Sequence, residues 1–297
     1  MARNLKVKVG MTKKGNTLIS NSAFSPRRGS FRAGGRIGHS KFTPLPWLIP
    51  ALFLFAWIAV SETGLIPTYL LPHPMEVGRA GYNYIFGTVG DASFAGRFLG
   101  DAGASLIRVG AGFGVAVIFG IPLGILSGRL AVVQRLMSTS VNALRAVPGI
   151  SWLPLAMIWF GIGIKTTIFL VALAAFFPIY LNSAAGARQI NPLLLQAGAM
   201  MGVNRLRGTF AILLPGAMPH IMTGLRLGLG ISWAYLVLGE LTGVPNGLGA
   251  VIMDARMLGR IDIIVVGIII IAIMGRLSDQ LLTISLKFCF RSARRMS

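Results

Sequence analysis

Residues 191–215 decide the fold of this chain; they read NPLLLQAGAMMG, then VNRLRGTFA, then ILLP. Asn191 and Pro192 are typical of a helix start, because asparagine caps free backbone N–H groups and proline fits the first helical position. Gly202 suits the helix's end. One helical face carries Leu193, Gln196, Ala197, Met200 and Met201. A mostly apolar helix pair between hydrophobic spans, where a loop is ordinarily polar, indicates either a surface covered by another molecule or a connector packed on the protein's own spans.

The composition is that of an integral membrane protein. The 297 residues are 54% hydrophobic and only 12% charged, with a mean hydropathy of +0.73, whereas soluble domains average about a quarter charged residues. The net charge of +20 does not indicate nucleic acid, because the basic residues gather between apolar segments with little aromatic interleaving. Membrane topology accounts for them.

Six segments have the roughly 20 apolar residues that a helix needs to cross the hydrocarbon. Pro148 and Pro154 interrupt the third, which makes it the weakest match. We therefore expect an all-α membrane protein with about six transmembrane helices, at 46–66, 103–126, 141–161, 166–185, 217–240 and 262–284.

Basic residues predict the orientation of these spans. If the N-terminus is cytoplasmic, twenty basic residues fall inside, Arg129, Arg135 and Arg145 among them, and only five fall outside. We expect both termini to be cytoplasmic.

The sequence divides into four parts. Residues 1–44 are basic, contain no acid, and are expected to form a disordered cytoplasmic tail near anionic lipid; an organellar transit peptide is the alternative. Residues 45–102 hold the first span and a periplasmic segment, 103–285 form the core with a loop at 191–208, and 286–297 are a second basic tail.

Glycines recur at four-residue spacing in the spans, which lines one helix face with small residues. Packing within the chain is the expected role, and a homodimer seam remains an alternative for one of the sets Gly110/Gly114, Gly120/Gly124/Gly128 and Gly224/Gly228.

The sequence offers no metal or nucleotide chemistry. Cys289 is the sole cysteine, the three histidines are scattered, and there is no Gly-Lys dipeptide, hence no phosphate-binding P-loop. We expect no metal and no cofactor bound by this chain.

One loop resembles the EAA loop of ATP-binding cassette (ABC) importer permeases. It contains Gln196-Ala-Gly198, then Gly202, then Ile212-Leu-Leu-Pro215, at the spacing of that motif. Further blocks resemble the nitrate/sulfonate/taurine branch of that family in the right order over roughly 100–290. They are Ser105-Leu-Ile-Arg108, Arg145-Ala-Val-Pro148, Trp152-Leu-Pro154, Trp159-Phe-Gly-Ile-Gly163, Phe176-Phe-Pro178, Asn182-Ser-Ala-Ala-Gly186, Thr223-Gly-Leu-Arg226, Trp233, Glu240, Gly247-Leu-Gly249 and Asp254-Ala-Arg256.

The resemblance implies a type I ABC importer permease of a bacterial inner membrane that carries a small, anionic solute such as nitrate, a sulfonate, taurine or bicarbonate. Its implied partners are two cytoplasmic ATPases that use ATP-Mg, a periplasmic binding protein and a second permease copy. The implied ATPase-coupling residues are Leu193, Gln196, Ala197, Gly198, Met200, Met201, Gly202, Ile212 and Pro215. Gln196 stands where the motif has glutamate, and Gly198, where it has alanine, lowers helix stability by about 1 kcal/mol.

Few ionisable residues occur within the expected spans, and such residues mark function by default. Arg276 and Asp279 are three apart, which favours a local ion pair over a substrate role. Arg108 and Arg226 suit oxyanions through their forked donors, with snorkelling or pairing with Glu240 as the alternative. The residues expected along a translocation path are Arg226, Trp233, Glu240 and Arg108.

A secondary carrier driven by an ion gradient is the alternative function. Such a carrier holds charge for its coupling ion inside the membrane and needs no apolar cytoplasmic helix pair.

Overall fold

The computed structural model describes residues 45–64, 66–90 and 92–289. The chain divides into two units, Met1–Ile49 and Pro50–Ser297, and the fold below is that of the second. The predicted basic tail at 1–44 lies outside the described residues, as does 290–297. The second tail was expected from 286, but the last helix continues to Cys289.

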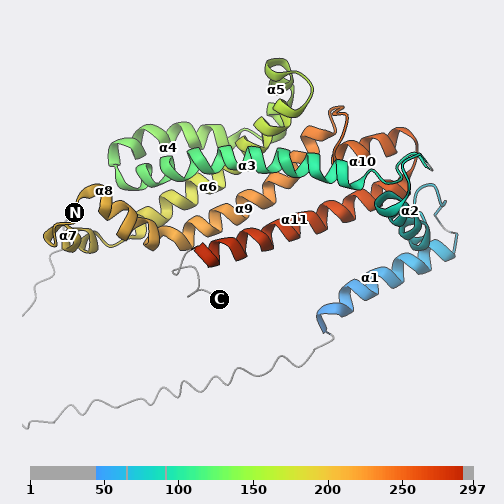
Figure 1. Cartoon of the computed structure of the whole chain (residues 1–297), viewed down its shortest axis with the longest axis horizontal. Coiled ribbons are helices and arrows are strands. Elements are labelled where there is room, and N and C mark those ends of the chain that lie inside the picture. The colour runs from blue at the N-terminus through green and yellow to red at the C-terminus, as the bar shows by residue number, and fades with distance from the viewer. Residues whose placement is uncertain (1–44, 65, 91, 290–297) are drawn as a thin grey trace, which may run out of the picture. The chain divides into compact units, whose positions relative to one another are not determined.

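The described chain is built from helices (Figure 1). Most are α-helices; η1 is a 3₁₀ turn and η2 is a π-helix. In chain order they are α1 Leu45–Glu62, α2 Pro74–Phe86, α3 Phe98–Arg129, α4 Ala131–Ala146, η1 Gly149–Trp152, α5 Leu153–Phe160, α6 Ile164–Gln189, α7 Pro192–Met200, α8 Arg205–Gly208, η2 Thr209–Leu213, α9 Leu214–Glu240, α10 Leu248–Met257 and α11 Ile261–Cys289.

Four helices among the described residues are long and apolar enough to cross a membrane: α3, α6, α9 with its preceding π-helix, and α11. They match the second, fourth, fifth and sixth expected spans. The third, expected at 141–161, is instead a pair of helices, Ala131–Ala146 and Gly149–Phe160, bent by 91°. The first corresponds to α1, whose apolar stretch Leu48–Glu62 is shorter than the length that crosses unaided.

Helix α6 packs against both α3 and α9, and glycines on those two helices allow the close approach. A Cβ atom on Gly124 of α3 would lie 2.6 Å from the carbonyl oxygen of Tyr180. One on Gly224 of α9 would lie 2.8 Å from the Cβ of Asn182. The expected packing within the chain is therefore confirmed for Gly120, Gly124, Gly128, Gly224 and Gly228, whereas no atom lies within 4 Å of a Cβ at Gly110 or Gly114.

The connecting helices lie at opposite ends of this bundle. Helices α7 and α8 follow α6 at one end, while α2 and α10 lie at the other (Figure 1). Helix α11 packs on α9, α10 and α2. The loop that resembles a coupling segment is thus separated from α10 by the length of the long helices.

The glycine packing predicts unequal effects of two identical substitutions on α3. Gly124→Ala forces the new methyl group against the backbone of α6, and should lower the free energy of unfolding by about 1–3 kcal/mol. Gly114→Ala meets no atom and should be neutral or stabilising by up to about 1 kcal/mol. Thermal unfolding midpoints in detergent measure both, and equal midpoints would contradict the described contact of α3 with α6.

Candidate functional site

The ends of helix α7 are formed as the sequence predicts. The Asn191 side chain accepts a hydrogen bond from the backbone N–H of Leu193 at 2.9 Å, with Pro192 at the first position. At the other end Gly202 has a φ of +80°. The N–H groups of Gly202 and Val203 donate to the carbonyls of Ala199 and Gly198, each at 3.0 Å, which is the pairing of a glycine-terminated helix.

Helix α7 presents a large apolar surface. Met200 is 84% exposed, and Leu193, Leu194, Met201 and the nearby Phe210 are also mainly exposed. Gln196 is exposed beside them, whereas Ala197, Ile212 and Pro215 are half-buried. Contiguous exposed apolar side chains of this kind mark a surface that binds another molecule.

Gly198 has a packing role that the sequence did not reveal. It is buried, and a Cβ at this position would lie 2.7 Å from the Cδ1 atom of Ile212. Helix α7 therefore lies directly against the π-helix η2. An alanine here would gain helix propensity but would displace the Ile212 side chain.

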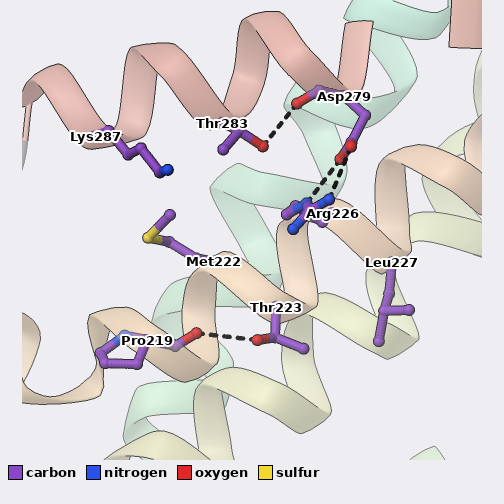
Figure 2. Close-up of a pocket in the computed structure, with 8 residues that line it drawn as sticks. All are labelled: Pro219, Met222, Thr223, Arg226, Leu227, Asp279, Thr283 and Lys287. Carbon is purple, nitrogen blue, oxygen red and sulfur yellow. Dashed lines mark hydrogen bonds and ion pairs between the residues drawn. The ribbon is translucent and has the colours of Figure 1, made fainter. Parts of the chain in front are cut away.

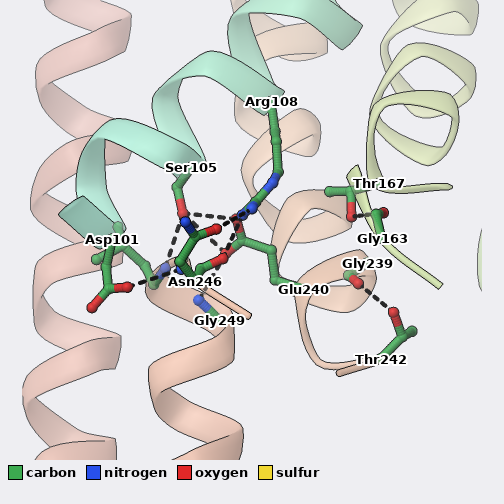
Figure 3. A network of polar contacts seen from close by, with 12 residues as sticks. Asp101, Ser105, Arg108, Gly163, Thr167, Gly239, Glu240, Thr242, Asn246 and Gly249 are labelled. Carbon is green, nitrogen blue, oxygen red and sulfur yellow. Dashed lines mark hydrogen bonds and ion pairs between the residues drawn. The ribbon is translucent and has the colours of Figure 1, made fainter. Parts of the chain in front are cut away.

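A buried polar network at the other end of the bundle centres on Glu240, which is 0% exposed, and Arg108, which is 2% exposed (Figure 3). The Arg108 Nη1 donates to Glu240 Oε1 at 2.5 Å, and the Ser105 hydroxyl donates to the same carboxylate at 2.8 Å. The backbone N–H of Gly249 donates to Glu240 Oε2 at 2.8 Å. Both Nη atoms of Arg108 also bond Asn246, at 2.7 and 2.6 Å.

The network continues to helix α2 and to the start of α10. Asp101 accepts hydrogen bonds from the Gly247 N–H at 3.0 Å and from the Tyr84 hydroxyl at 3.1 Å. Burial and the neighbouring Asp101 raise the pKa of Tyr84 above its ordinary value. The backbone N–H of Leu248 donates to Ser105 Oγ at 2.9 Å. These contacts tie α2, α3, the end of α9 and α10 together.

The structure therefore gives three of the four predicted path residues packing roles in this chain. Arg108 and Glu240 pair with one another, which is the alternative that the sequence left open. Trp233 is buried among the core side chains, and its Nε1 donates to Ser278 Oγ at 2.8 Å.

Arg226, the fourth path residue, lines a cavity of about 600 Å³ between α9 and α11 (Figure 2). Its guanidinium group binds the Asp279 carboxylate through two hydrogen bonds, at 2.8 and 2.9 Å. The expected local pair of Arg276 with Asp279 is also present, at 3.6 Å. A place on a translocation path stays a prediction for Arg226, as it does for Trp233, Glu240 and Arg108.

The described residues bring together no group of three or more His, Cys, Asp or Glu side chains that could hold a metal ion. His73 instead lies 3.2 Å from Glu62, and His220 lies 2.8 Å from Gln189.

Sequence reasoning missed the start of helix α4, because the third span was expected to start at 141. Arg145 was counted among the cytoplasmic residues although it lies within that expected span. Helix α4 instead starts at Ala131 and carries Arg145 in its last turn, at the break before α5. The prolines at 148 and 154 were the available signal, because a broken span ends its first helix before Pro148.

Comparison with known proteins places this arrangement in context. Residues 120–287 match the family model described as binding-protein-dependent transport system inner membrane component. The chain is 35% identical to the taurine transport system permease protein of Escherichia coli over 77% of its own length and 82% of the relative's. It is 33% identical to the nitrate import permease protein of Synechocystis over 71% and 77%.

A solved structure shares the fold. The chain resembles the methionine ABC transporter MetNI in an inward-facing conformation, with a TM-score of 0.51 and 20% identity over 62% of this chain and 94% of the other.

The buried pair predicts a large effect of removing one partner. Glu240→Gln leaves the Arg108 charge buried without its counter-ion and should lower the free energy of unfolding by roughly 3–5 kcal/mol. Asp262→Asn is the matched control, because its partner Arg260 is 47% exposed and such pairs contribute about 1 kcal/mol or less. Thermal unfolding measures both, and a loss for Glu240→Gln no larger than the control's would contradict a structural role for the network.

Proposed function

Because the chain belongs to the family of binding-protein-dependent transport system inner membrane components, the permease subunits of ABC importers, we propose that its cargo is a small oxyanion such as a sulfonate or nitrate. Two relatives at 35% and 33% identity are named for taurine and nitrate transport. Taurine carries a sulfonate group, so both solutes present oxygen atoms that share a negative charge. Family membership also decides against the alternative of a carrier driven by an ion gradient.

The exposed apolar face of α7 is the observation that supports the rest of the proposal. In water, Met200, Met201 and Leu193 would leave a large apolar area exposed, and covering it is favourable. We assign this face to a cytoplasmic ABC ATPase, and Gly198, Gly202, Ile212 and Pro215 to the framework that holds it. Neutral Gln196 makes the contact one of packing and hydrogen bonds.

The complete importer, in this proposal, contains two permease copies, two ATPase copies and a periplasmic binding protein. ATP-Mg is bound and hydrolysed by the ATPases, consistent with the lack of a P-loop in this sequence. Closure of the ATPases moves α7. Because α7 lies directly against η2, the start of α9 moves with it, and the spans alternate between inward- and outward-open states.

The placement of α7 and α10 at opposite ends of the bundle puts them on opposite sides of the membrane (Figure 1), and the excess of basic residues predicts that the α7 side and both termini are cytoplasmic. Reporter fusions after residues 40, 135, 200 and 290 should report the cytoplasm, and fusions after 90 and 250 the periplasm. Paired phosphatase and fluorescent-protein reporters measure this. A periplasmic signal at 200 would contradict ATPase docking, because α7 could not reach its partner.

Docking on α7 predicts that a charge at Met200 uncouples the importer. Met200→Asp would bury an unpaired carboxylate against the ATPase at a cost of several kcal/mol. Substrate-stimulated ATP hydrolysis and co-purification of the ATPase should therefore fall at least about tenfold. Ala197 is a poorer test position, because its side chain is half-buried within this chain. A charge there would also disturb the packing of α7 itself.

Met257→Asp is the matched control. Met257 is 73% exposed on α10, at the other end of the bundle. This variant should retain ATPase binding. Normal hydrolysis and transport by Met200→Asp would show that α7 does not dock on an ATPase.

A further inference from the structure

A second cavity lies at the break between α4 and α5. It is half open, has a volume of about 400 Å³ and is bounded by that break, by the middle of α6 and by the second half of α9. Since α6 and α9 are membrane-length helices, the cavity lies at membrane depth. Its polar lining residues are Arg145, Asn182 and Tyr235, and its aromatic walls include Trp152 and Phe177.

The broken span supplies irregular backbone to this cavity. The chain leaves helical geometry at Val147 and Pro148 and resumes as the short η1 turn. Gly149 packs so closely on the Tyr235 ring that a Cβ there would force the ring to shift. Non-helical backbone at membrane depth is tolerated where protein buries it or where it lines a water-filled cavity, and broken helices of this kind form the solute sites of other transporters.

The cavity is positively charged. Arg145 contributes a guanidinium group, and no Asp or Glu is among the lining residues. In contrast to Arg226, which Asp279 neutralises, Arg145 has no ion pair among the described residues. A cation at this depth requires water or an anion to remain charged.

One face of α4 leads toward this cavity. Arg135, Ser138, Asn142 and Arg145 follow one another at spacings of three, four and three residues, which places them along one side of the helix. Arg135, Asn142 and Arg145 are exposed. The row covers about 15 Å at 1.5 Å per residue. A polar, acid-free row on a membrane helix must face water or protein, because lipid cannot satisfy its hydrogen bonds.

We infer that the cavity is a binding site for the transported oxyanion within the membrane, with Arg145 as its charged ligand and Tyr235 and Asn182 as neutral donors. The inference rests on the proposed function and deepens it, since it assigns part of the selectivity to the permease itself. A guanidinium fork matches the oxygens of a sulfonate or nitrate. Trp152 and Phe177 offer an apolar wall for a short carbon chain, and the volume is within the range of small-molecule sites.

Thiol labelling tests the charge and hydration of the site without requiring transport. In a Cys289→Ser background of the assembled importer, Asn142→Cys places a thiol one turn before Arg145. An anionic methanethiosulfonate reagent that carries a sulfonate should modify this thiol about tenfold faster than its cationic trimethylammonium counterpart, with each rate normalised to a free thiol. Replacing Arg145 with glutamine should bring the ratio of the anionic to the cationic labelling rate to about one.

Leu144→Cys is the matched control, two residues further on the opposite side of α4. Leu144 is 43% exposed, and a thiol there that faces lipid rather than water should react with neither reagent, because only the thiolate is reactive. Equal rates at Asn142→Cys, or a preference unchanged by Arg145→Gln, would overturn the inference.

Uptake through the complete importer tests binding, with taurine, ethanesulfonate and nitrate offered separately. Arg145→Gln should reduce uptake of the accepted anion at least about tenfold, Arg145→Lys should restore part of it, and Tyr235→Phe should cause a smaller loss. The control Arg188→Gln lies in the exposed last turn of α6 and should transport normally. Co-purified ATPase should be unchanged in all of them.

The two proposals fail differently. If the unmodified importer takes up none of the anions, the proposed cargo is wrong. If it takes one up and Arg145→Gln does so equally well, the cargo stands and the site is wrong. Loss of assembly in both Arg145 variants, with a normal ratio at Asn142→Cys, would make Arg145 a structural residue and overturn its role as a ligand.

Discussion

The close contact of α6 with α3 on one side and α9 on the other is the constraint on which the rest of this structure depends. In a membrane, helices gain little from hiding apolar side chains, so association relies on close packing. Gly124 and Gly224 allow it by removing the side chains that would separate the backbones. The position of α6 then fixes both the start of α7, three residues beyond its end, and one wall of the Arg145 cavity.

The two ends of the bundle use different chemistry because they meet different requirements. At the α10 end, Glu240 is bound by a guanidinium, a hydroxyl and a backbone N–H, which leaves α10 little freedom to move relative to α3 and α9. At the α7 end, the exposed side chains are apolar and flexible, with Met200 and Met201 foremost. Methionine adapts its shape to a partner, so this end suits a contact that changes during a cycle.

Local signals in the sequence predicted local structure well. Asn191 and Gly202 mark the ends of α7 because capping depends on only a few neighbouring residues. Four membrane-length helices followed from hydropathy alone. Long-range pairings could not be predicted in this way: Arg226 bonds Asp279 across 53 residues, whereas the spacing indicated only the Arg276 pair. The start of α4 at Ala131 was also missed, because its polar face lowers the hydropathy that defines a span.

The Arg108–Glu240 pair joins residues 132 positions apart, which sets an order of events during biosynthesis. Arg108 enters the membrane with α3 while Glu240 is still to be translated. Until α9 has followed, the guanidinium group must stay near water or lipid headgroups at the membrane surface, because it has no counter-ion inside. The first turns of α3 can therefore settle only after α9 is inserted, and α10, whose first N–H groups bind the same cluster, can dock only after both.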